Sequence, residues 1–274
     1  MRFDNLFSPA WWSRNRQRLM PELKRRTAQG LSRVSGDRLH FGENARRIEK
    51  LRGTHQGRRA VIIGNGPSLK VEDLTRLQGE ITFAANKIFL AFDRTPWRPT
   101  YYNVEDPLVI QQNYEKINSL GGFPKLLARH ANGYWVQDEW TILYDLMVLP
   151  EDRFQEFSPS PHQGLNCGFS VCISSLQWAW FMGITEIYLI GVDFSFTVPK
   201  ADPAGMIRSE GEVNHFLPGY RAPGEKWQIP NLDLQERAFA QARDWLAARG
   251  VKVFNATRGG KLEVFPRVDF DRVF

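Results

Sequence analysis

Residues 60–69 read AVIIGNGPSL, and this stretch decides the fold class. Its first four residues form a continuous apolar run, which is typical of a strand buried on both faces of a parallel sheet. The next five, 64–68, are the small and polar residues that form turns. We therefore expect a buried strand that enters a glycine-bounded turn, and we expect this turn to lie against the phosphate-bearing part of a nucleotide-like ligand.

From residue 59 onward the chain alternates short apolar runs with stretches of helical pattern. Strands are expected at 60–63, 81–85, 100–104, 125–129, 186–190 and 251–254, and helices at 71–77, from 107, at 168–182 and at 232–249. The segment 134–149 is ambiguous between helix and loop. This alternation predicts an α/β, Rossmann-like fold with an open, mainly parallel sheet and helices on both faces.

Residues 1–58 differ from the rest in charge. Residues 1–59 contain about 15 Lys and Arg against about 5 Asp and Glu, so most of the net charge of +6 lies in this segment. We interpret 1–58 as a basic helical N-terminal extension and 59–274 as a nucleotide-binding catalytic domain, with a lid or loop at about 195–230. Two hypotheses remain open for the extension: packing on its own domain or a partner subunit, and peripheral contact with an anionic membrane surface.

Composition narrows the class of protein. A chain of 274 residues with 42% hydrophobic residues can bury a large core, and it has neither a spanning apolar run nor a signal peptide's apolar core. We expect a cytoplasmic protein, peripheral at the inner membrane if the extension binds lipid. Nucleic acid is not expected as a partner, because no nucleic-acid module accompanies the charge, and the oligomeric state is left open. The two cysteines, Cys167 and Cys172, are interpreted as buried thiols.

The candidate site residues are those that follow the strands, since ligands of such sheets bind beyond the carboxyl ends of the strands. They are small or polar: Gly64, Asn65, Gly66, Ser68, Asn86, Glu105, Asp106, Gly191 and Asp193. Gly64 and Gly66 would let backbone amides approach an anion, although spacing alone fits a tight structural turn nearly as well. The asparagines offer both donors and acceptors to a ribose or a base edge, and turn capping is their alternative role.

Two segments carry a resemblance to known families. The motif GNGPSL at 64–69, with Asn86 about twenty residues later and EIYLIGVDF at 186–194 after a buried helix, resembles bacterial sialyltransferases of glycosyltransferase family 42. The same opening also resembles the superfamily that contains the 6-hydroxymethylpterin diphosphokinases (MptE-like) and the flagellar motility accessory factors. The resemblance spans roughly residues 59–265 and excludes the N-terminal extension.

The sialyltransferase resemblance implies roles for several residues. It implies that Asn65 and Asn86 contact the CMP part of the donor and that Ser170, which opens the buried helix, lines the same site. The family's catalytic histidine has no counterpart at 225–229, so His215 is the candidate base, with an ordinary imidazole pKa near 6.5 that suits proton transfer. Tyr220 is the counterpart of the tyrosines that stabilise the leaving phosphate. The diphosphokinase branch typically carries an aspartate where this chain has Asn86, which favours the transferase branch.

Glu105 and Asp106 suggest a different chemistry. Adjacent carboxylates at a strand end can bind Mg²⁺, as a diphosphokinase that uses ATP would require, and Asp106 is the candidate ligand. The alternative is that Glu105 orients a basic neighbour such as Arg98. A sialyltransferase-like enzyme would need no metal or other cofactor.

The leading prediction is therefore a glycosyltransferase that moves a sugar, such as a nonulosonic acid, from a CMP-activated donor to a surface-glycan acceptor. The first alternative is a diphosphokinase that uses ATP and Mg²⁺. The second alternative is a nucleotide-binding module without catalysis, which the missing family histidine keeps open.

Overall fold

The computed structural model describes residues 34–147, 156–197, 206–209 and 214–274. Their main feature is one sheet of seven parallel strands in the order β5-β4-β3-β2-β1-β6-β9. The strands are β1 Arg59–Ile63, β2 Ile81–Ala85, β3 Tyr101–Val104, β4 Lys125–Ala128, β5 Thr141–Tyr144, β6 Glu186–Ile190 and β9 Lys252–Asn255. The predicted α/β class and the open parallel sheet are confirmed.

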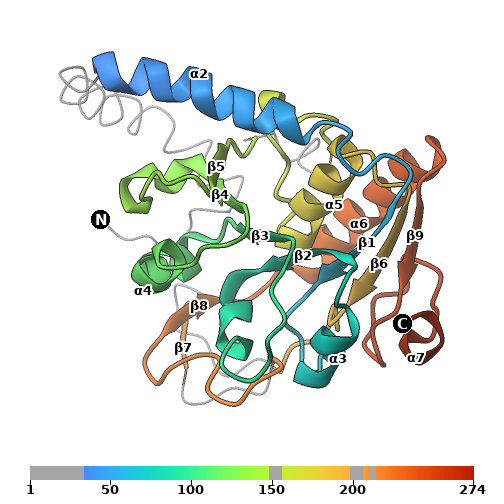
Figure 1. The fold of residues 1–274 in the computed structure, drawn as a ribbon. Helices are drawn as coiled ribbons and strands as arrows, with labels where there is room; N and C mark the ends of the chain where they lie inside the picture. The colour runs from blue at the N-terminus through green and yellow to red at the C-terminus, as the bar shows by residue number, and fades with distance from the viewer. Residues whose placement is uncertain (1–33, 148–155, 198–205, 210–213) are drawn as a thin grey trace.

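Helices cover both faces of the sheet (Figure 1). On one face, apolar side chains of β1, β2 and β6 pack against α2, α5 and α6, and on the other face they pack against α3, α4 and α7. The helices are α2 Val34–Leu51, α3 Val71–Arg76, α4 Pro107–Asn118, α5 Val171–Phe181, α6 Leu232–Ala247 and α7 Phe270–Val273, with short 3₁₀ segments η1 Asn86–Ala91, η2 Arg129–Tyr134 and η3 Pro161–Gln163. Alternate residues of β1 point to opposite faces, so Ile62 belongs to the first layer and Ile63 to the second.

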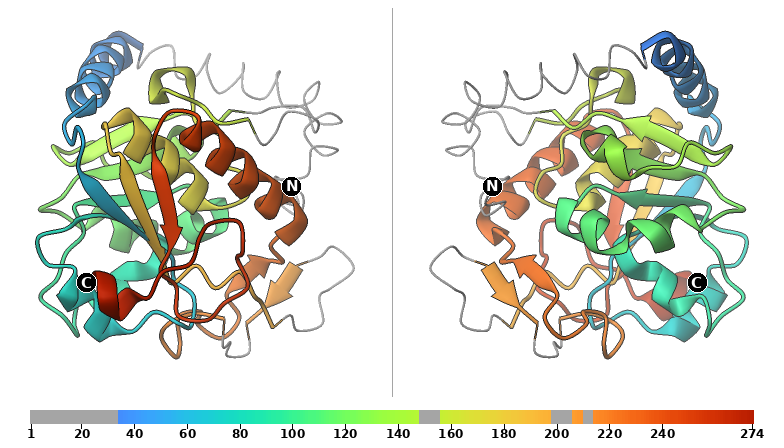
Figure 2. Two further views of the ribbon diagram at one scale, coloured as in Figure 1. Left: turned by 90° about the vertical axis from the view of Figure 1, so that its right-hand side faces the viewer. Right: turned by 90° about the vertical axis from the view of Figure 1, so that its left-hand side faces the viewer.

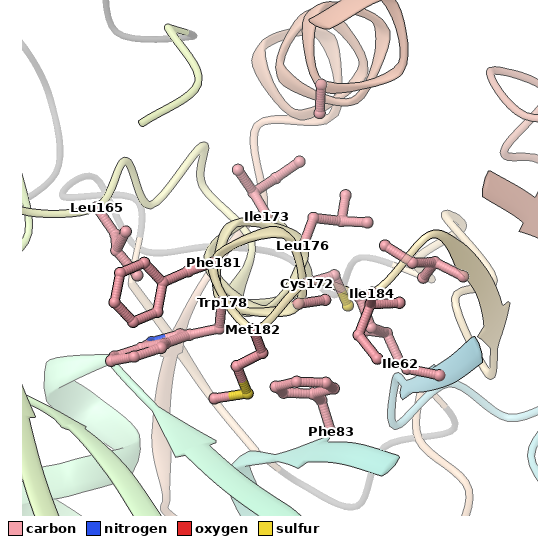
Figure 3. Close-up of a cluster of buried hydrophobic side chains, with 14 of the residues drawn as sticks. Ile62, Phe83, Leu165, Cys172, Ile173, Leu176, Trp178, Phe181, Met182 and Ile184 are labelled. Atoms are coloured by element: carbon pink, nitrogen blue, oxygen red, sulfur yellow. The ribbon is translucent and has the colours of Figure 1, made fainter. Parts of the chain in front are cut away.

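Helix α5 is the centre of the larger core layer. Figure 3 looks along this helix and shows apolar side chains around it, with Trp178 and Phe181 on one side and Ile62 and Phe83 of the sheet below. Trp178 is fully buried, and most residues of the helix are buried with it. This burial explains why the sequence of α5 is apolar nearly all round rather than on one stripe.

Two segments differ from the sequence-based expectation. The stretch 134–149 contains the edge strand β5, which the sequence left between helix and loop because four residues are too few to show a period. The segment 195–230 is not wholly irregular, since β7 Met206–Arg208 and β8 Lys226–Gln228 pair in an antiparallel hairpin. Figure 2 shows this hairpin near the carboxyl ends of the parallel strands, below α6.

The edge strand β5 is closed by helix α2. The side-chain amide of Asn44 donates to the carbonyl of Leu143 at 2.8 Å and accepts from its N–H at 2.7 Å, and both bonds are buried. Ile48 of the same helix is 3% exposed and packs in the core. Helix α2, which the sequence analysis placed in the N-terminal extension, is thus packed on the sheet and protects an edge that would otherwise expose unpaired backbone groups.

The first 33 residues of the predicted basic helical extension lie outside the described residues. Among the helices that the structure does describe, none is both long enough and apolar enough to cross a bilayer.

Replacing Asn44 by alanine should lower the free energy of unfolding by about 2 kcal/mol, because the buried N–H of Leu143 loses its acceptor. Urea denaturation measures the change. Asn118→Ala is the matched control, since Asn118 also binds one backbone carbonyl and one N–H, but at the surface, where water replaces the amide. Equal losses in the two variants would contradict the proposed edge closure.

Candidate functional site

A large cavity lies where the strand order reverses. From β1 the chain builds the sheet outward through β2 to β5 and then returns to place β6 on the other side of β1. Beyond the carboxyl ends of these strands lies a cavity of about 540 Å³. Open parallel sheets bind ligands beyond the carboxyl ends of their strands at such a switch point.

The structure brings almost all of the predicted site residues to this cavity. Its lining includes Gly64, Asn65, Gly66, Asn86, Asp106, Ser170, Gly191, Asp193, His215 and Tyr220. Ser68 is different, because it does not line the cavity. Its hydroxyl donates to Asp193 Oδ2 at 2.7 Å and its N–H donates to Oδ1 at 3.2 Å, so Ser68 fixes the Asp193 carboxylate. The roles of these residues towards a ligand stay predictions.

The glycines after β1 serve contact between loops. The N–H groups of Gly64 and Gly66 donate to the carbonyls of Ile190 and Gly191, each at 2.8 Å. A Cβ on Gly64 would collide with the backbone of Gly191, and a Cβ on Gly66 would collide with the Asp193 carboxylate. These two N–H groups are therefore not the anion donors that the sequence analysis expected, and the side chain of any other residue would force the two loops apart.

Asn65 and Asn86 line the cavity. The Asn65 side-chain N–H₂ donates to the carbonyl of Ala85 at 2.9 Å, which fixes the orientation of its amide. The Oδ1 atoms of Asn65 and Asn86 are buried, and neither has a hydrogen-bond partner among the described residues. Because a buried acceptor without a donor is costly, these two oxygens suit a ligand that carries N–H or O–H groups.

Backbone strain gathers around the same cavity. Asn86, Phe169 and Phe194 have φ angles of 51°, 58° and 52°, and they are the non-glycine residues with positive φ in the described part of the chain. All three line the cavity. A left-handed conformation costs about 1–3 kcal/mol at a phenylalanine and persists only where the surrounding packing imposes it. The local concentration of strain is typical of a functional site.

Glu105 is a buried carboxyl group of the cavity wall. It is 6% exposed, and burial raises its pKa to about 8, although hydroxyl groups of Ser174 and Tyr144 partly offset this. The Tyr144 hydroxyl lies 3.1 Å from Oε2. Glu105 therefore carries a proton at neutral pH. It does not orient Arg98 as the sequence analysis considered, because the Arg98 guanidinium donates to the carbonyls of Thr95 and Trp97.

Asp106 caps helix α4. Its Oδ1 accepts the N–H of Leu108 at 2.8 Å and of Val109 at 3.3 Å. Burial raises the pKa of Asp106, and the cation of Arg221 opposes that rise. Within the described ranges no group of three or more His, Cys, Asp or Glu side chains could hold a metal ion.

Neither cysteine is a nucleophile in this site. Both Cys167 and Cys172 line the cavity as free thiols. Burial raises the pKa of each to about 12, so neither forms a thiolate at neutral pH.

The segment 214–228, which we call the lid segment, closes the cavity from outside the sheet. The N–H of Phe216 donates to the Asn65 carbonyl at 3.0 Å, and the N–H of Lys87 donates to the Tyr220 hydroxyl at 3.2 Å. The Lys87 ammonium lies 2.8 Å from the Glu225 carboxylate, and their side chains are only 8% and 11% exposed. A nearly buried ion pair thus joins the lid segment to η1.

The lid segment places an aromatic pair and a cation at the cavity. The His215 ring stacks on Tyr220, with centroids 3.9 Å apart and an angle of 7° between the planes. Arg221 also lines the cavity, with its guanidinium 4.1 Å from the centre of the Trp227 ring. The sequence analysis missed Arg221. Its position directly after Tyr220, the predicted phosphate contact, is the signal that could have found it.

Comparison with known families gives one match. The family model described as 6-hydroxymethylpterin diphosphokinase MptE-like matches residues 39–199, which is more than half of the chain. The family is one of transferases of the diphosphokinase type. No curated protein matches the chain.

Raising the pH should destabilise the protein through Glu105. The folded-state pKa of about 8 exceeds the ordinary value of 4.5, so between these values the folded state keeps a proton that the unfolded chain has lost. The stability that this proton provides is complete below pH 4.5 and falls as pH rises towards 8, by up to about 1.4 kcal/mol per pH unit. Urea denaturation at pH 5, 6, 7 and 8 should show a flatter profile for Glu105→Gln, and the wild-type profile for the exposed control Glu236→Gln.

Removing Glu225 should loosen the lid segment. Glu225→Ala leaves the Lys87 ammonium buried without its counter-charge, at a cost of about 3–5 kcal/mol, enough to raise opening about 100-fold or more. Hydrogen exchange of the backbone amide of Phe216 measures this opening, because that N–H binds the Asn65 carbonyl only when the segment is docked. The double variant Lys87→Met/Glu225→Leu should recover most of the protection, and unchanged exchange in Glu225→Ala would show that the ion pair does not hold the lid segment.

Proposed function

The chain belongs to the 6-hydroxymethylpterin diphosphokinase MptE-like family, and on that premise we propose that it transfers a diphosphoryl group from ATP to a hydroxymethyl group on a pterin-like heterocycle. The alcohol oxygen forms a bond to the β-phosphorus of ATP, the bond between that phosphorus and the α–β bridging oxygen breaks, and AMP leaves. The alcohol proton passes to a base of the protein. This proposal replaces the sugar transfer that the sequence analysis placed first.

The observation that carries the proposal is the overlap between the family match and the cavity. The matched residues 39–199 include every cavity-lining loop after β1, β2, β3 and β6, as well as the beginning of α5. The lid segment and α6 complete the cavity from outside the matched range. We infer that the strand ends hold the nucleotide and that the lid segment helps to select the acceptor.

The size and polarity of the cavity support a nucleotide. A volume of about 540 Å³ lies within the usual range of small-molecule sites. The unpartnered amide oxygens of Asn65 and Asn86 can accept bonds from an exocyclic amine or from ribose hydroxyls. Ser170 caps the beginning of α5 at the cavity, where the helix dipole favours an anionic group.

The residues of the cavity fit a magnesium ion that arrives with the nucleotide. Mg²⁺ is commonly held by one or two carboxylates together with phosphate oxygens, and only Oδ1 of the Asp106 carboxylate accepts the helix-capping bonds. Asp106 would hold the ion, and the ion would offset the negative charge of the phosphates. Protonated Glu105 is a poor ligand, so we assign it no part in holding the metal.

His215 is the proposed base. It lines the cavity, and its stack on Tyr220 fixes the ring plane. An imidazole has an ordinary pKa near 6.5, so it can accept the alcohol proton near neutral pH. The Tyr220 hydroxyl accepts the N–H of Lys87. The position of the stacked His215–Tyr220 pair therefore depends on docking of the lid segment.

A second candidate is transfer of a sugar from a CMP-activated donor to a glycan acceptor. Asn86 favours it, because the diphosphokinase branch typically carries an aspartate at that position. The same cavity would then hold CMP through Asn65 and Asn86, without a metal, and His215 would take the acceptor proton.

Thermal unfolding with ATP, CMP or UDP, each with and without Mg²⁺, separates the two candidates. We expect ATP with Mg²⁺ to stabilise the fold by about 2.7 kcal/mol at 100 times its Kd, and Asn65→Ala to weaken this effect. Asn118→Ala, a surface change, should leave it intact. Production of AMP from ATP in the presence of a hydroxymethylpterin then tests the reaction.

Other outcomes of this experiment are equally decisive. Stabilisation by CMP without metal, and none by ATP with Mg²⁺, would select the sugar transferase. Absence of any nucleotide effect would contradict both candidates and favour a cavity for a different class of ligand.

A further inference from the structure

The charges of the cavity are unequal. Its wall contains three carboxyl groups, those of Glu105, Asp106 and Asp193. Among the described residues that line it, Arg221 is the only Lys or Arg. A phosphate group therefore meets one fixed cation in this wall. Removal from bulk water strengthens the interaction between that cation and an anion.

We propose that Arg221 is the phosphate-binding residue of the cavity, held ready for its ligand by the fold of the lid segment. The inference rests on the proposed nucleotide-dependent function, and it applies to both candidates because ATP and a CMP-activated sugar each carry phosphate. A guanidinium suits this task, since its planar N–H groups can bind two phosphate oxygens at once.

Three contacts position Arg221. The hydroxyl of the preceding residue, Tyr220, accepts the N–H of Lys87 at 3.2 Å. The N–H of the following residue, Ala222, donates to Glu225 Oε2 at 2.7 Å. The guanidinium itself lies over Trp227, a 4% exposed residue of β8. The Tyr220 side chain on one side, the Ala222 backbone on the other and the Trp227 ring beneath the guanidinium restrict the motion of Arg221, so less conformational entropy is lost when an anion binds.

The Lys87–Glu225 ion pair links these contacts to the sheet. Glu225 accepts the Lys87 ammonium through both carboxylate oxygens, at 2.8 and 2.9 Å, and the Lys87 ammonium lies 5.4 Å from the centre of the Tyr220 ring. Lys87 belongs to η1, directly after Asn86 at the end of β2. The position of Arg221 is therefore coupled to the same loop that presents the Asn86 amide.

Electrostatics also connect Arg221 with the cavity wall. Burial raises the pKa of Asp106, the N–H groups of Leu108 and Val109 oppose that rise, and the Arg221 cation opposes it to a smaller extent. Asp106 thus partly balances Arg221 before a ligand arrives. A doubly charged phosphate group offers a stronger partner than one carboxylate.

Pyrophosphate is the probe for this inference, because it carries the phosphate chemistry without a base or sugar. We expect isothermal titration to show binding to the full chain, Arg221→Met to weaken it about 10- to 100-fold, and Arg221→Lys to fall between. Arg249→Met is the matched control, because Arg249 also stacks on a tryptophan, Trp245, but at the exposed end of α6. The Arg249→Met variant should bind pyrophosphate with the affinity of the wild type. Circular dichroism and the melting temperature without ligand show whether each variant folds, and Arg221→Gln replaces any variant that does not.

Each outcome decides the inference. Absence of pyrophosphate binding to the wild-type chain, or equal affinity in the wild type and Arg221→Met, overturns it. If ATP with Mg²⁺ binds the wild type while Arg221→Met binds pyrophosphate normally, the inference fails and the proposed function stands. If pyrophosphate binds through Arg221 but no nucleotide binds, the inference stands and the proposed function fails.

Discussion

The close contact between the loops after β1 and β6 is the constraint on which the site depends. The backbone of Gly64 and Gly66 lies against Gly191 and the Asp193 carboxylate with no room for a Cβ, and two backbone hydrogen bonds of 2.8 Å hold the loops together. The Ser68 hydroxyl donates to the Asp193 carboxylate across the same contact. Because these loops leave neighbouring strands of the sheet, their contact sets one wall of the cavity.

The opposite wall depends on a different kind of interaction. The lid segment buries Leu217, Tyr220 and Trp227, and a nearly buried ion pair, Lys87 with Glu225, joins it to η1. Such a pair is costly to desolvate and costly to break, so it specifies one docked arrangement more than it adds stability. His215, Tyr220 and Arg221 are therefore placed by aromatic packing together with this ion pair, whereas the residues of the strand ends are placed by hydrogen bonds.

The wall between them combines buried carboxyl groups with strained backbone. Glu105 keeps a proton at neutral pH because burial raises its pKa to about 8. In the next residue, Asp106, one carboxylate oxygen accepts an N–H group of the first turn of α4. The positive φ angles of Asn86, Phe169 and Phe194 lie around the same cavity, and such concentrated strain is typical of functional sites.

The sequence by itself determined the class of fold, most of the strands and helices, and the edge of the sheet at which the site lies. Continuous apolar runs such as 60–63 are typical of buried strands at this spacing, and parallel strands bring their carboxyl ends to one edge. The sequence did not show the four-residue strand β5, and it left Gly64 and Gly66 open between anion binding and a structural turn, whereas the structure shows that they permit the contact with the loop after β6. Only the tertiary structure decided the protonation of Glu105, the pairing of Lys87 with Glu225 and the place of Arg221 in the cavity. Lys87 and Glu225 are far apart in the chain, and both their contact and the pKa of a carboxyl group depend on which groups folding brings together and which it removes from water.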